Sequence, residues 1–196
     1  MAYLLTKGIK GSNIFRTVFF MPNLIGGIVL GYIWSMIFDG ILSRYNTSIL
    51  LNSTYGFWGL IILMAWQQIG YMMIIYIAGL QAVPGDMLEA AKIDGASEWK
   101  TLWDIIIPNV MPSITICTFL TLTNSFKLYD QNLALTNGRP YNGAIHTTEM
   151  LALNIVNSNT LKTKGVGQAK AVMFFVLVAI IGIFQMKSTH DKEVQQ

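Results

Sequence analysis

Long stretches without charge constrain this chain more than any other feature of its sequence. Residues 17–38, 57–80 and 105–126 contain no Asp, Glu, Lys or Arg, and apolar side chains dominate each of them. A helix needs about 20 such residues to cross the hydrocarbon core of a bilayer. Each stretch therefore predicts one transmembrane helix. A shorter apolar run at 168–186 predicts a fourth, with Lys170 reaching to the outer interface.

The composition agrees with a multi-pass membrane protein. Only 12% of the residues are charged and 53% are hydrophobic, whereas about a quarter of a soluble domain is charged. The net charge of +3 includes no run of like charges, which argues against nucleic acid as a partner. We therefore expect an all-α membrane protein, a transmembrane helix bundle in contact with membrane lipid.

Several kinds of chemistry are excluded or disfavoured by the residues present. The single Cys117 rules out a disulfide within the chain, and His146 and His190 lie too far apart in sequence to suggest a zinc pair. No G-x4-G-K-[ST] phosphate loop occurs, so ATP should not be hydrolysed here by that route. We expect no catalytic residue, no metal and no cofactor.

Residues 81–104 form the one charged, amphipathic segment between two apolar runs. Pro84 suits the first position of a helix, and Gly95 suits the left-handed conformation that closes one. Ser97 can then cap a second helix, which leads into the span at 105–126. The small side chains of Ala90 and Ala91 would give the first helix a flat face that another protein could approach closely.

This segment also carries a family resemblance. Glu89, Ala90 and Ala91 are followed by Gly95 and, after nine intervening residues, by Ile105-x-Ile107-Pro108. The spacing resembles the EAA loop of the membrane subunits of bacterial binding-protein-dependent ABC importers, in consensus E-A-A-x3-G-x9-I-x-L-P, with Ile107 in place of Leu. The resemblance implies a cytoplasmic coupling helix that docks into a separate ATP-binding subunit, with the following residues involved: Glu89, Ala90, Ala91, Asp94, Gly95 and Pro108.

Further segments are similar to the carbohydrate branch of this family, which includes the maltose and glycerol-phosphate types. They include Phe15-Arg16, Met21-Pro22, Ala78-Gly79-Leu80-Gln81 and Leu135-Thr-Asn-Gly-Arg-Pro140, where Arg139 replaces a Gly of the L-T-x-G-G-P pattern. The resemblance implies the type I importer fold in a bacterial inner membrane. It also implies alternating access, a second permease subunit in a heterodimer, and an extracytoplasmic solute-binding protein that delivers a sugar-like solute. ATP hydrolysis is then expected on a partner, so the chain is not expected to be an enzyme.

The resemblance also sets an expected topology. Residues 81–104 should be cytoplasmic, and 39–56 and 127–167 should be outer connections. Orientation rests on this loop and on the basic flank of Lys7, Lys10 and Arg16, because Lys and Arg are otherwise evenly divided between the two sides. Such subunits usually carry six or more spans, whereas four are predicted. Met1 to Leu5 is similar to the tail of a preceding span, so we expect an N-terminal part to be missing.

Polar and small residues within the spans leave two interpretations open. Gln67, Thr121, Asn124 and Ser125 could line a solute path, or they could join helices through hydrogen bonds. The pair Gly27-x3-Gly31 could admit a second helix at backbone distance or mark a kink. A secondary transporter or a membrane scaffold is the alternative function. The first three spans lack the ionisable side chains that ion coupling would require, apart from their ends.

Overall fold

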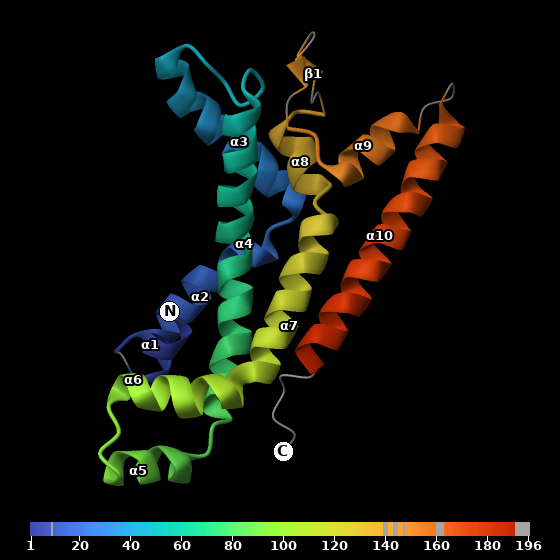
Figure 1. The fold of residues 1–196 in the computed structure, drawn as a ribbon. Helices are drawn as coiled ribbons and strands as arrows, with labels where there is room; N and C mark the ends of the chain where they lie inside the picture. Colours follow the sequence, from blue (N-terminus) through green and yellow to red (C-terminus); the bar gives the residue numbers. More distant parts are fainter. Residues whose placement is uncertain (9, 139–140, 143–144, 147, 160–162, 191–196) are drawn as a thin grey trace.

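The computed structural model describes residues 1–8, 10–138, 141–142, 145–146, 148–159 and 163–190. Helices make up most of this part of the chain, as the predicted fold class requires (Figure 1). Arg139, Pro140, Lys162 and Lys192 lie outside the described residues, and so do the side chains of His146 and His190. In chain order the elements are α1 Ala2–Thr6, α2 Ser12–Phe20, η1 Met21–Leu24, α3 Gly27–Leu42, η2 Ser43–Tyr45, α4 Ser53–Gln81, α5 Gly85–Ile93, α6 Glu98–Thr101, η3 Leu102–Ile106, α7 Ile107–Phe126, α8 Asp130–Leu135, β1 Tyr141–Asn142, β2 Ile145–His146, α9 Leu151–Ser158 and α10 Lys164–His190.

Among the described residues, three helices are long and apolar enough to cross a membrane, namely Ser53–Gln81, Glu98–Phe126 and Lys164–Lys187. They contain the spans predicted at 57–80, 105–126 and 168–186. α4 is the central helix, because it contacts α1, α2, α3, α7 and α8, while α10 packs on α7 and α9. In Figure 1, α5 and α6 lie at one end of this bundle, and α8, α9 and β1 lie at the other.

The first predicted span differs from the expectation of one continuous helix over 17–38. The chain instead forms Ser12–Leu24 and Gly27–Tyr45, which meet at an angle of 100° and could together make a fourth crossing. Pro22 lies in the short 3-10 helix η1, and the backbone at Ile25 is extended. Proline removes a donor from the helical ladder, and an extended residue ends it, so the break follows from local sequence.

Two glycines of α3 allow the short helix α8 to pack against its backbone. A Cβ added at Gly31 would lie 2.7 Å from the Ala134 Cβ, and one at Gly27 would lie 2.9 Å from the Gln131 side chain. The predicted close approach of a second helix at this pair is confirmed. Gly70 in α4 has the same role for α2, whose backbone at Phe19 fills the place of a side chain.

Buried and partly buried polar side chains fix the end of the bundle that carries α8 and α9. The Asn132 side chain is fully buried, donates to the Thr148 carbonyl at 2.8 Å and accepts from the Met150 amide at 3.0 Å. Lys170, at the start of α10, donates to Asn154 Oδ1 at 2.7 Å and to Ser158 Oγ at 2.6 Å. These bonds give the Lys170 ammonium polar partners on α9. The positive charge next to the apolar part of α10 is therefore hydrogen-bonded.

Candidate functional site

The helix α5 is an exposed element at one end of the bundle (Figure 1). Pro84 takes the N-cap position, one residue before the position predicted for it, and Asp86 and Lys92 place complementary charges at the two ends of the helix dipole. Glu89 and Ala90 are exposed, whereas Ala91 is buried, at 6% exposed. The helix therefore presents a carboxylate beside a small side chain on its free face.

Gly95 closes α5 with a Schellman motif. Its φ is +72°, the amide of Ala96 donates to the Ala91 carbonyl at 3.0 Å, and the amide of Gly95 donates to the Lys92 carbonyl at 3.2 Å. Asp94 is the C-cap residue and is exposed. A Cβ added at Gly95 would meet nothing within 4 Å, so glycine is needed there for its backbone conformation and not for space.

The second helix of the loop begins as the sequence predicts. The Ser97 hydroxyl accepts from the Lys100 amide at 3.3 Å and caps α6. Lys7 forms an ion pair of 2.8 Å with Glu98, which ties the segment after α1 to the start of α6. The hydrogen bond to Glu98 raises the pKa of the Lys7 ammonium above its ordinary value. Because both side chains face water, the pair positions these segments more than it stabilises them.

A π turn joins α6 to the span α7. It covers Leu102–Ile106, and the amide of Ile107 donates to the Leu102 carbonyl five residues earlier. Pro108 explains this turn, because proline has no amide hydrogen and its ring clashes with the carbonyl four residues before it. The chain nevertheless stays helical from Glu98 to Phe126. α5 is therefore connected to α7 by a short turn at Gly95 and by continuous helix after it.

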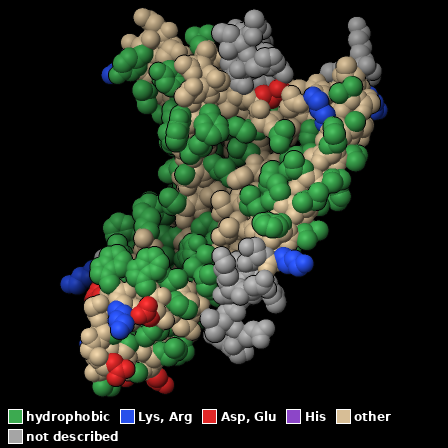
Figure 2. All heavy atoms as spheres, in the orientation of Figure 1, with side chains coloured by type: hydrophobic (Ala, Val, Ile, Leu, Met, Phe, Trp, Pro, Cys, Tyr) green, Lys and Arg blue, Asp and Glu red, His purple; other side chains and the backbone are tan. Residues whose placement is uncertain are grey.

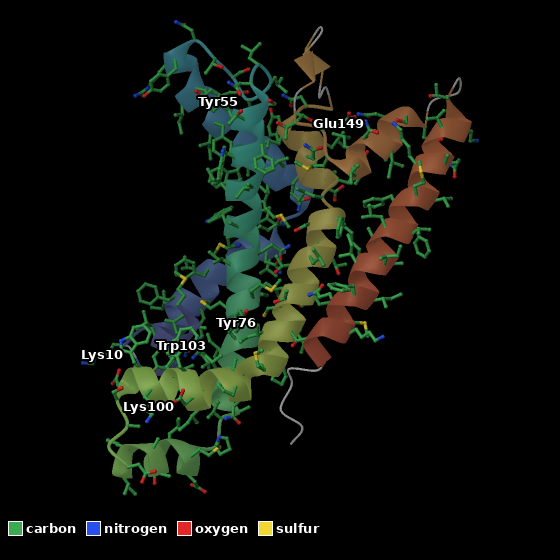
Figure 3. All side chains as sticks on the ribbon, in the orientation of Figure 1. Lys10, Tyr55, Tyr76, Lys100, Trp103 and Glu149 are labelled. Carbon is green, nitrogen blue, oxygen red and sulfur yellow. The ribbon has the colours of Figure 1, made fainter. Side chains whose placement is uncertain are left out.

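A groove between α4 and α7 brings together two of the predicted solute-path residues. Its volume is about 380 Å³ and its lining includes Thr121 and Ser125. The remaining lining residues are Met72, Tyr76, Cys117, Thr118 and Leu122. Figure 3 shows Tyr76 on α4 beside α7. Asn124 is partly buried and is not among the residues that line this groove. The groove offers hydroxyl groups beside an aromatic ring.

Gln67 lies away from this groove, where three segments meet. Its Nε2 donates to the Ile25 carbonyl at the bend after η1, at 3.3 Å, and its Oε1 accepts from Gln131 Nε2 of α8 at 2.9 Å. The side chain is 7% exposed. Both ends of its amide are therefore used in joining α4 to the bend and to α8.

Thr118 and Tyr76 line the groove but were not predicted, and the sequence could have indicated only the first of them. Thr118 stands three residues before Thr121 and seven before Ser125, which is the spacing of one helix face. Tyr76 gives no such signal, because the side of α4 that faces α7 depends on how the two helices pack. Within the described residues, no group of three or more His, Cys, Asp or Glu side chains is placed to hold a metal ion.

Comparison with known proteins identifies the family of the chain. Residues 1–187 match the model of the binding-protein-dependent transport system inner membrane component family. The probable starch degradation products transport system permease protein AmyD of Thermoanaerobacterium thermosulfurigenes is 43% identical, over 100% of this chain and 68% of its own length. The multiple sugar-binding transport system permease protein MsmF of Streptococcus mutans is 30% identical, over 99% of this chain and 69% of its own.

A solved structure agrees with this assignment at the level of the fold. The crystal structure of a bacterial alginate ABC transporter, in complex with a periplasmic protein that carries an alginate pentasaccharide, superposes with a TM-score of 0.67. The aligned region covers 94% of this chain and 67% of the other, at 17% identity. By family match, sequence identity and fold, this chain belongs to the inner membrane components of binding-protein-dependent transport systems.

Proposed function

We propose that this chain is the permease subunit of an ATP-driven importer, and that α5 is the helix through which a separate ATPase moves it. The observation that carries the proposal is the exposure of Glu89 and Ala90 on a helix that is tied to the span α7 by the Gly95 turn. Family membership supports it, because such components belong to binding-protein-dependent transport systems. ATP would then be hydrolysed on the partner subunit, and α5 would lie in the cytoplasm.

Motion would reach the spans along the backbone. The Schellman turn at Gly95 closes α5 with two backbone hydrogen bonds, and two residues later the chain enters the helix that begins at Glu98 and runs into α7 without a break. α7 packs on α4, so a displacement of α6 acts on the two helices that border the groove. Alternation between two openings of the groove would follow from rigid-body movement of these helices.

The proposed solute is a sugar or a related polyol. Thr118, Thr121 and Ser125 supply hydroxyl groups in the groove, and Tyr76 supplies an aromatic face, both of which suit a sugar ring. The names of the relatives point the same way, since they refer to starch degradation products and to multiple sugars. A second permease subunit would complete the path, and an extracytoplasmic binding protein would deliver the solute.

Removal of the Glu89 carboxylate tests the coupling role. In Glu89→Ala the permease should remain in the membrane, but the ATPase should no longer co-purify with it and solute uptake should be lost. The matched control is Glu98→Ala, which removes another exposed carboxylate of the same loop, one that pairs with Lys7 of this chain. Retention of the ATPase by both variants, or its loss from both, would contradict docking through α5.

A further inference from the structure

Two tryptophans of the loop stand out by their exposure. Trp99 and Trp103 are four residues apart, on the same face of the helix that starts at Glu98, and they are 71% and 60% exposed. Large aromatic rings are among the side chains that most often bury their surface in proteins. Two such rings, aligned on one helix face and left uncovered by the described part of this chain, need a partner of some kind.

Their position along the chain indicates the membrane. Trp103 lies two residues before the uncharged stretch at 105–126, which forms most of a membrane-crossing helix. Figure 1 shows that α6 lies across the foot of the bundle before the chain turns up into α7. If α7 crosses the membrane, Trp103 would lie close to the level where the bilayer meets water, and tryptophan is enriched at that level in membrane proteins.

The surroundings of the two rings fit the same boundary. In Figure 3, Trp103 and Lys10 lie on the side of α6 that faces α2, whereas Lys100 lies on the side that faces α5. Ile14 and Val18 of α2 are also exposed. Figure 2 shows hydrophobic side chains above the charged side chains that lie around α5 and α6. From α2 toward α5 the side chains are therefore first apolar, then aromatic together with lysine, and then charged.

We propose that α6 and the π turn η3 form an interfacial membrane anchor, with Trp99 and Trp103 inserted into the lipid leaflet on the α5 side. The occupant of this face is lipid, because the face is continuous with a membrane span and because Lys10 beside it suits the phosphates of anionic headgroups. Lys100 lies on the side of the helix that faces α5 (Figure 3). Asp104 follows Lys100 by four residues, which is the spacing of one helix face.

The anchor would keep one end of the coupling loop at a fixed depth. The turn at Gly95 connects α5 to α6. A partner that moves α5 would therefore also have to displace two aromatic rings held in the interface. The inference concerns a face of the loop different from the Glu89 and Ala90 face. It can therefore fail while the proposed docking of α5 holds, and the reverse is also true.

Spin labels at three positions test the anchor in the complete importer. The chain carries Cys117→Ser, the partner subunits are free of cysteine, and a nitroxide is attached in turn to Trp99→Cys, Trp103→Cys or Lys100→Cys. The complex is placed in vesicles of phosphatidylethanolamine and phosphatidylglycerol. Each single variant keeps at least one of the two tryptophans, and all three positions are exposed, so folding should be retained.

The expected result is a contrast between the two sides of α6. Labels at 99 and 103 should collide often with oxygen, which concentrates in lipid, and rarely with a water-soluble nickel chelate. The label at 100 should show an oxygen-to-nickel ratio several-fold lower. High nickel accessibility at 99 and 103 would place them in water and overturn the proposal. Low accessibility to both reagents would overturn it too, because a protein partner would then cover the face.

Discussion

The left-handed backbone of Gly95 determines how α5 is attached. Its φ of +72° closes the Schellman motif, and there is open space where a Cβ would go. For a residue other than glycine this conformation costs about 1–2 kcal/mol. The cost would fall on the junction between two helices, at an exposed site remote from the packed spans, and so it should change the geometry of the loop without unfolding the bundle.

Alanine at Gly95 should reduce transport, and alanine at Gly85 should not. Both positions have room for a Cβ, but a positive φ occurs only at Gly95 of the two. We expect Gly95→Ala to lower the ratio of solute uptake to ATP hydrolysis, and Gly95→Val to lower it further, at unchanged levels of membrane protein. Uptake and ATPase rates in proteoliposomes measure this ratio. Equal behaviour of Gly95→Ala and Gly85→Ala would contradict the argument from backbone strain.

The groove predicts a difference between two threonines of α7. Thr121 lines the groove, whereas Thr115 is not among its lining residues and donates to the Met111 carbonyl within its own helix at 3.1 Å. A neutral hydrogen bond contributes about 0.5–1.5 kcal/mol, so Thr121→Ala should raise the KM for solute by roughly 2–10-fold. Thr115→Ala should leave KM unchanged. If initial uptake rates give the same KM for Thr121→Ala and Thr115→Ala, Thr121 does not contact the solute.

Local signals explain which parts of the site could be predicted. The Ser97 cap and the Gly95 turn depend on neighbours within a few residues, so the sequence predicts them correctly. The groove depends on which faces of α4 and α7 meet. For that reason the sequence does not predict Tyr76 as a groove residue. Gln67 is polar, as a groove residue would be, but it bonds instead to the bend at Ile25 and to Gln131 of α8.

At the scale of elements, the bend between η1 and α3 shows what hydropathy leaves out. Residues 17–38 are as free of charge as a straight span, so the length of the apolar stretch predicts one. The 100° angle arises from Pro22 and from the extended backbone at Ile25, and the contact of the Phe19 backbone with Gly70 of α4 holds α2 in place. The last of these is a long-range contact, which no local pattern reveals.

Packing of α8 on α3 should be sensitive to one methyl group at Gly31. An added Cβ would lie 2.7 Å from the Ala134 Cβ and 2.9 Å from the Gln131 carbonyl oxygen. Overpacking of this kind costs typically about 1–3 kcal/mol. We expect Gly31→Ala to lower the Tm in detergent, whereas Gly40→Ala in the same helix, where nothing lies within 4 Å, should not. A lower Tm for Gly40→Ala alone would contradict this packing.

At the scale of the whole molecule, the two ends of the bundle should open to opposite sides of the membrane. α5 and α9 lie at opposite ends in Figure 1, and Ile93 and Val156 are exposed on them. In a Cys117→Ser background, an impermeant maleimide should label Val156→Cys in intact cells and Ile93→Cys only in inverted vesicles. Ile180→Cys, an exposed position within α10, should react in neither. Labelling of 93 and 156 from one side would contradict the topology.

The π turn at Leu102–Ile106 adds one further consequence. A π turn holds one residue more than the α-helical turn it replaces, and each residue of an α-helix advances the chain by about 100° around its axis. If this π turn tightened into an α-helical turn, everything before it would rotate by about a quarter of a circle relative to α7, while the hydrogen-bond ladder on both sides survived. The segment between α5 and the bundle could therefore rotate about the axis of α7, so that a force on the loop would twist the spans relative to one another.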